Sequence, residues 1–131
     1  MASPPHTLVI LGGAKSIGGQ CARKFSAAGW NCFIADDNAK ALEKLSDELN
    51  GRLACHHGSP AKKLGRSNIL AGAIDAFERI DAVIHIPGLP EPTSFFDETA
   101  EDCFEEDIMA AAREVTSVIR LFSSQILSQA I

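Results

Sequence analysis

Four short apolar runs alternate along this chain with segments whose apolar residues recur at helical spacing. The runs cover residues 7–11, 31–35, 52–56 and 81–86, and the first, TLVIL, is continuous in aliphatic and β-branched residues. Continuous runs of this kind are typical of strands that are covered on both faces. Helical crossovers between parallel strands are right-handed, so helices come to lie on both faces of the sheet. We therefore expect a three-layer α/β domain with a parallel sheet in the order 3-2-1-4.

Each predicted strand is followed by a predicted helix. The first helix is expected to end at Gly29, and the second to begin after Asn38, a residue type that caps helix N-termini. Ser59 and Pro60 have the pattern of an N-cap followed by proline at the first helical position, which predicts the start of the third helix. The third helix is expected to bury Leu70, Ile74 and Phe77. The last helix is long, and its predicted sheet-facing seam is Phe104, Ile108, Ala111, Val115, Val118, Phe122 and Ile126.

A glycine-rich turn, LGGAKSIGG at residues 11–19, joins the first predicted strand to the first helix. Gly12 and Gly13 allow a sharp turn, Gly18 allows the helix to pack close to the sheet, and the helix N-terminus offers N–H groups to a diphosphate. Asp36 lies about 20 residues further on, at the tip of the second strand, where an acidic side chain can bind ribose hydroxyls. This pattern predicts a Rossmann-like dinucleotide site. The alternative is a glycine-rich turn that binds nothing.

The same residues resemble the short-chain dehydrogenase/reductase family, whose glycine loop reads Thr-Gly-x-x-x-Gly-Ile-Gly. Gly12, Ile17 and Gly18 match that loop, and AFERIDAVIHIPG is similar to the segment that ends in the family's Asn-Asn-Ala-Gly motif. The chain departs from the family where Leu11 replaces threonine, Ser16 replaces the central glycine, and HIPG replaces Asn-Asn-Ala-Gly. The cofactor contacts implied by the residues and by this resemblance are Gly12, Lys15, Ser16, Ile17, Gly18, Asp36 and Gly88.

The choice between NAD and NADP depends on the charges near the adenosine ribose. Asp36 and the adjacent Asp37 would repel a 2′-phosphate, whereas Lys15 could attract one. Because two carboxylates oppose one lysine, we expect NAD, with NADP the less favoured cofactor.

The resemblance also implies a catalytic serine and a Tyr-x-x-x-Lys pair, which carry the proton in hydride transfer. The sequence contains no tyrosine, so no catalytic residue is assigned and the chain is expected to be the nucleotide-binding half of an oxidoreductase, truncated relative to the full family fold. The alternative is a non-catalytic NAD-binding or protein-interaction module. A reductase that uses His85 as its acid or base is the least favoured hypothesis. No metal site is predicted, because Cys55, His56 and His57 have no further spaced ligand.

Composition and net charge limit the classes of partner that we expect the chain to bind. A net charge of −5 argues against nucleic acid and anionic membranes, and the apolar runs are too short to span a bilayer. The four cysteines lack paired spacing and lie in apolar contexts, so we expect buried, reduced thiols and a cytoplasmic protein. Residues 1–131 are expected to form one domain with an extended or disordered tail at 1–6. Self-association through the last helix or the exposed edge of the fourth strand is expected.

Overall fold

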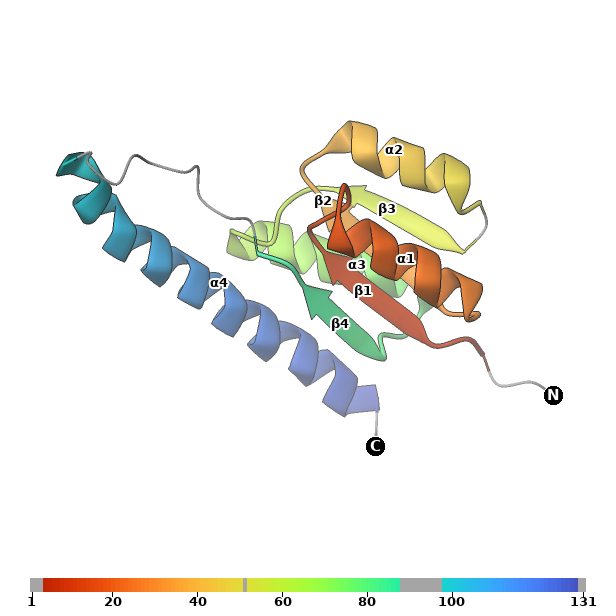
Figure 1. The fold of residues 1–131 in the computed structure, drawn as a ribbon. Coiled ribbons are helices and arrows are strands. Elements are labelled where there is room, and N and C mark those ends of the chain that lie inside the picture. The colour runs from red at the N-terminus through yellow and green to blue at the C-terminus, as the bar shows by residue number, and fades with distance from the viewer. Residues whose placement is uncertain (1–3, 51, 88–97, 130–131) are drawn as a thin grey trace.

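A computed structural model describes residues 4–50, 52–87 and 98–129 of the chain (Figure 1). Four parallel strands, β1 (Thr7–Leu11), β2 (Asn31–Asp36), β3 (Leu53–His57) and β4 (Ala82–His85), form one sheet in the order β3-β2-β1-β4. The predicted parallel α/β sheet and its strand order are therefore confirmed.

Four helices cover the two faces of this sheet: α1 (Ile17–Ala27), α2 (Ala39–Glu48), α3 (Lys63–Phe77) and α4 (Glu98–Gln129). Residues of α1 and α2 pack with Leu8 and Ile10 on one face, and residues of α3 and α4 pack with Val9 and Leu11 on the other. All five residues of β1 are fully buried. Because both of its faces are covered, β1 carries the continuous apolar run seen in the sequence.

Two predicted helix signals are confirmed. The Asn38 side chain accepts a hydrogen bond from the Ala41 N–H at 3.0 Å, and so caps α2. Gly29 follows α1 with a φ of 93°, a backbone conformation that favours glycine.

The predicted start of the third helix is wrong. Ser59 and Pro60 form a turn in which the Ser59 hydroxyl accepts a hydrogen bond from the Ala61 N–H at 3.2 Å, and α3 begins only at Lys63. A Cβ at Gly65 would overlap the Ser59 carbonyl oxygen, so this turn folds back against the first turn of α3. The fully buried residues of α3 are Ile69 and Ala73, while the predicted Leu70, Ile74 and Phe77 pack at the edge of the same core.

Among the predicted seam residues whose burial the structure describes, the prediction is correct only from Val115 onward, and the Phe104 side chain lies outside the described part. Val118 and Phe122 are buried against the sheet, whereas Ile108 is 50% exposed and Ala111 is exposed. The physical reason is length, because 32 residues of helix extend about 48 Å, far beyond strands of four to six residues. Figure 1 shows the N-terminal part of α4 projecting past the sheet.

A charged cluster stabilises the sheet at the end where β1 and β4 begin. Asp81 accepts hydrogen bonds from the Thr7 N–H, at 2.8 Å, and from the guanidinium of Arg79. Burial alone would raise the pKa of Asp81, but the hydrogen bonds from Arg79, Thr7 and His6 outweigh it and lower that pKa. The cluster therefore fixes the start of β1 against the segment that leads into β4.

The prediction of buried thiols holds for Cys32 and fails for Cys55. Cys32 is fully buried, Cys21 is partly buried and Cys55 is exposed, and all three are free thiols. Cys55 is exposed because β3 is an edge strand. None of the helices in the described part of the chain is both long and apolar enough to cross a membrane.

Candidate functional site

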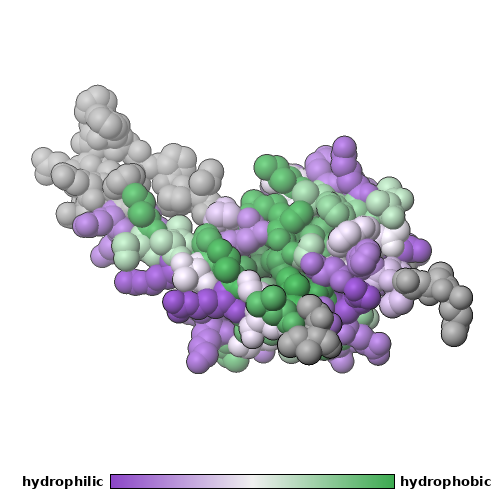
Figure 2. Space-filling view, turned by 90° about the horizontal axis from the view of Figure 1, so that it is seen from below, coloured by the Kyte–Doolittle hydropathy of each residue, from purple (hydrophilic) through white to green (hydrophobic). Residues whose placement is uncertain are grey.

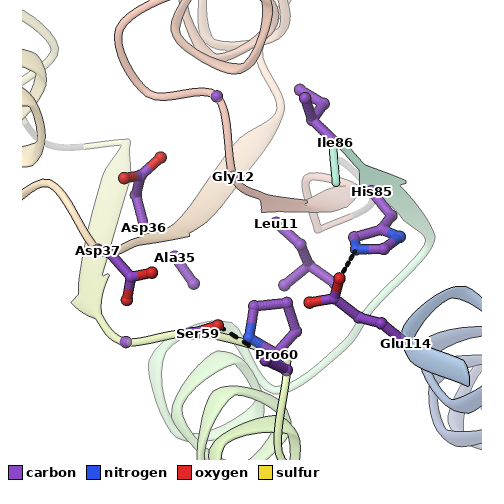
Figure 3. Close-up of a pocket in the computed structure, with 13 residues that line it drawn as sticks. Leu11, Gly12, Ala35, Asp36, Asp37, Ser59, Pro60, His85, Ile86 and Glu114 are labelled. Atoms are coloured by element: carbon purple, nitrogen blue, oxygen red, sulfur yellow. Dashed lines mark hydrogen bonds and ion pairs between the residues drawn. The ribbon is translucent and has the colours of Figure 1, made fainter. Parts of the chain in front are cut away.

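The carboxyl ends of the four strands border one cavity of about 320 Å³. In open parallel sheets this edge is where ligands bind. The walls come from the ends of β1, β2 and β4, from the turn after β3, and from one residue of α4. Figure 3 shows Asp36 and Asp37 on one side of the cavity, His85 and Glu114 on the opposite side, and Pro60 below.

Gly12 forms the cavity wall directly after β1. Its φ of 95° is one that side chains rarely adopt, and its N–H donates to the Ala35 carbonyl at 2.8 Å. A Cβ at Gly12 would overlap the Ile86 carbonyl oxygen, and a Cβ at Gly18 would overlap the Gly12 carbonyl oxygen. Only glycine at both positions therefore allows the loop to lie between the end of β4 and the start of α1.

Asp36 connects the glycine loop to α2. One carboxylate oxygen accepts from the Ala14 N–H at 2.9 Å, and the other accepts from the Asn38 N–H at 2.7 Å. Sequence reasoning assigned Asp36 to ribose recognition alone and missed this structural role. A carboxylate has about four acceptor directions, so both oxygens keep capacity for a ligand.

His85 and Glu114 form a pair at the inner end of the cavity. The His85 Nε2 and Glu114 Oε2 atoms are 3.8 Å apart, and the two side chains are 11% and 18% exposed. Burial lowers the pKa of His85, although Glu114 acts in the opposite direction. Within the described residues, the buried His85 Nε2 has no hydrogen-bond partner. The imidazole is therefore neutral near pH 7 and has an unused polar atom beside a carboxylate.

The other predicted cofactor contacts lie away from the cavity or outside the described residues. Lys15 lines a separate hollow that it shares with Lys40 and Lys44, between α1 and α2. Ser16 is exposed at the N-terminus of α1, and Ile17 is 64% exposed. The Ser16 hydroxyl lies 3.5 Å from the Gly13 carbonyl oxygen and makes no side-chain cap for α1. Gly88 lies outside the described residues.

Two observations indicate that the residues of the site fit a nucleotide. Because Gly12 and Gly18 have no Cβ, the loop turns tightly between β4 and α1, and the first N–H groups of α1 receive no side-chain cap. The described lining residues include the acids Asp36, Asp37 and Glu114 and no lysine or arginine. The cavity thus accommodates a hydroxyl-bearing nucleoside better than an additional phosphate group.

Sequence reasoning missed Glu114. No motif includes it, and it lies 29 positions after His85 in the chain. One signal was available, because Glu114 lies four residues before the buried Val118 and next to the half-buried Val115. A carboxylate on the sheet-facing side of an amphipathic helix indicates a polar partner.

Comparisons with a family model and with known proteins show what this chain is similar to. A family model described as short chain dehydrogenase matches residues 6–130. Over 81 residues the chain is 30% identical to a probable 2,4-dienoyl-CoA reductase of Bacillus subtilis (strain 168), a match that covers 60% of this chain and 32% of that protein. Over 97 residues it is 32% identical to an uncharacterized oxidoreductase of the same organism, and this match covers 70% of this chain and 14% of that protein.

Two solved structures show the same fold. A short chain dehydrogenase/reductase from Burkholderia phymatum in complex with NAD matches with a TM-score of 0.80 and 18% identity, over 98% of this chain and 47% of that one. The 3-ketoacyl-(acyl-carrier-protein) reductase from Brucella melitensis complexed with NADH matches with a TM-score of 0.73 and 17% identity, over 93% and 50%. The chain thus spans about half the length of these structures and a third or less of the curated relatives.

Proposed function

The chain belongs to the short chain dehydrogenase family, and from this premise we propose that it binds a nicotinamide dinucleotide, NAD in preference to NADP, at the carboxyl edge of its sheet. The observation that carries the proposal is the single cavity that brings Gly12 and Asp36 together. The two relatives of known structure described above were crystallised with NAD or NADH, which supports this class of ligand.

Each part of the ligand has a corresponding part of the site. The diphosphate lies over Gly12 and Gly13, where the N-terminus of α1, which has no side-chain cap, favours an anion. The adenosine ribose lies beside Asp36, whose remaining acceptor directions bind the ribose hydroxyls.

The preference for NAD follows from the charges in the cavity. Asp36 and Asp37 both line it, so a 2′-phosphate there would face two carboxylates. Lys15, the one residue of the glycine loop that could attract this phosphate, lines the neighbouring hollow instead.

Oxidoreductase activity is the more general part of the proposal. When bound, NAD supplies the hydride acceptor of such reactions. The residues described here bind and orient it, and the 131 residues contain no tyrosine for the proton relay expected in this family. Our first candidate function is therefore the nucleotide-binding half of an NAD-dependent oxidoreductase. The absence of tyrosine supports a second candidate, a module that binds NAD without turnover.

Calorimetry with NAD, NADH and NADP tests the binding proposal. We expect NAD and NADH to bind and NADP to bind at least tenfold more weakly. Asp37→Arg should reverse this preference by supplying a cation for the 2′-phosphate, because the Asp37 side chain is exposed and only its backbone carbonyl is hydrogen-bonded, to His57. Asp47→Arg, on an exposed position of α2, is the matched control. Absence of NAD binding at millimolar concentration would refute the proposal.

Self-association is a further part of the proposed function. Met109 and Ile119 of α4 are 48% and 59% exposed, and the residues of β4 at the edge of the described sheet are only partly buried. Figure 2 shows apolar surface gathered across one face of the molecule. Sedimentation velocity should give a dimer or larger species that Ile119→Asp dissociates. Leu64→Asp, at a more exposed position on α3, is the control and should have no effect.

A further inference from the structure

A second hollow, the α3–α4 groove, has a volume of about 380 Å³ and lies between two helices that pack on the same hydrophobic core. Its polar lining residues are Lys63, Arg66 and Ser67 of α3, and Ser117, Arg120 and Ser124 of α4. Within each helix these residues are three or four positions apart, so each helix contributes one face to the groove. None of them lines the cavity at the carboxyl edge of the sheet. The groove is therefore separate from the dinucleotide site.

The lining of the groove is positively charged in a chain whose net charge is −5. Lys63, Arg66 and Arg120 line it, and none of the lining residues is acidic. Within the described residues, none of these three cations takes part in a salt bridge. Like charges that lie close together repel one another, and an anion between them would remove this cost. The groove therefore favours an anionic ligand.

Arg66 is held in position by the turn that precedes α3. Its Nη1 donates hydrogen bonds to the carbonyl oxygens of Pro60, at 2.9 Å, and of Ala61, at 3.1 Å. The N–H groups on Nε and Nη2 are not used in these two bonds and can donate to a ligand. Because the half-buried guanidinium is already fixed, it would lose little side-chain entropy on binding.

The size and donors of the groove indicate which class of anion fits. Pockets of about 300 Å³ and more hold small molecules, so the groove is larger than one inorganic ion requires. Packed helices lie about 8–10 Å apart, so a ligand that contacts Arg66 on one helix and Arg120 on the other needs two anionic groups. Phosphate oxygens accept from guanidinium groups and from hydroxyls, and both kinds of donor line the groove.

We propose that the α3–α4 groove binds a small molecule that carries two linked phosphate groups. One phosphate group lies beside Lys63 and Arg66, and the other lies beside Arg120. The serine hydroxyls donate to the remaining phosphate oxygens, and the half-buried Leu121 contacts the carbon atoms of the ligand. This site adds to the proposed function and does not depend on it.

An NMR titration of the ¹⁵N-labelled full chain with inorganic diphosphate, at constant ionic strength, tests the proposal. We expect saturable shifts of the Ser67, Ser117 and Arg120 amides, with a dissociation constant below about 1 mM. Inorganic phosphate should bind at least fivefold more weakly, because it reaches only one helix. Arg120→Gln should weaken diphosphate binding at least fivefold, since it removes a charged donor. Lys44→Gln removes the same charge from the hollow between α1 and α2, and should change the affinity by less than twofold.

Four results would overturn the proposal. The first is no saturable shift at millimolar diphosphate. The second is a shift confined to the glycine loop and reversed by NAD, which would place the diphosphate in the dinucleotide site. The third is equal weakening by Arg120→Gln and Lys44→Gln, which would mean that overall charge governs binding. The fourth is tighter binding of a short polyglutamate peptide to the same amides, which would assign the groove to an acidic protein segment.

The test also separates this inference from the proposed function. A chain that binds diphosphate in the groove and does not bind NAD would refute only the proposed function. A chain that binds NAD and shows no shift of the groove amides with diphosphate would refute only the inference.

Discussion

Replacing Gly12 by alanine should destabilise the protein much more than the same change at Gly29. Both glycines have nearly the same backbone conformation, with φ values of 95° and 93°. Alanine at such a φ costs about 1–2 kcal/mol at either position. At Gly29 the new Cβ would meet only the Arg52 Nη1 atom, 3.9 Å away, whereas at Gly12 it would overlap the Ile86 carbonyl oxygen.

That overlap cannot be relieved locally. The Ile86 N–H donates to the Leu11 carbonyl at 2.8 Å, and the Gly12 N–H donates to the Ala35 carbonyl at 2.8 Å, so moving either segment disrupts the sheet edge. Forcing an additional carbon into such a site costs a further 1–3 kcal/mol or so. We therefore expect a loss of about 3 kcal/mol for Gly12→Ala, roughly 2 kcal/mol more than for Gly29→Ala.

Urea unfolding of the two variants measures this difference. Both substitutions change the unfolded chain in the same way, so that contribution cancels in the comparison. With an m-value of about 2 kcal/mol/M, the two unfolding midpoints should lie about 1 M apart. If the variants unfold at the same urea concentration, the close approach of Ile86 to Gly12 does not hold the loop in place, and the argument that this loop requires glycine is wrong.

Three further predictions concern charged groups. Asp81→Asn should lower the free energy of unfolding at pH 7 by about 1–2 kcal/mol, because the hydrogen bonds from Arg79 and the Thr7 N–H lower the pKa of Asp81. This stabilisation is complete above pH 3.8 and is lost as pH falls through the lower folded pKa, so acid titration of unfolding should bring the two curves together. For His85, burial lowers the folded pKa below 6.5, so the unfolded chain takes up the proton first and stability falls as pH decreases from 6.5. His85→Gln should remove this part of the pH dependence in thermal unfolding, and an unchanged slope would contradict the burial of the imidazole. Lys15→Ala should change NAD affinity by less than about twofold, since tighter or looser binding beyond this range would mean that Lys15 reaches the ligand.

Much of the fold could be predicted because the relevant signals are local. The continuous run of β1 reports that both of its faces are covered, and Asn38 and Gly29 mark helix ends through their own backbone requirements. The start of α3 was predicted wrongly for a related reason. Ser59 and Pro60 satisfy the local rule for a helix start, but their turn packs against Gly65 and the helix begins at Lys63 instead.

The candidate site was predictable in part. Gly12 and Asp36 were identified because the glycine turn and the acid at the next strand tip lie at a fixed spacing within one βαβ unit. The hydrogen bonds of Asp36 to Ala14 and Asn38 were not predictable, since the same carboxylate can serve the ligand, the backbone or both.

The sequence by itself determined the order of strands and helices, the glycines of the loop and the acid beside them, because each follows from the conformational preferences of a few consecutive residues. Only the tertiary structure placed Glu114 next to His85, put Lys15 outside the cavity and left half of α4 beyond the sheet. These features depend on how far helices extend over a sheet of limited size and which side chains meet there. Contacts between distant parts of a chain are set by the packing of whole elements, and no local pattern records them.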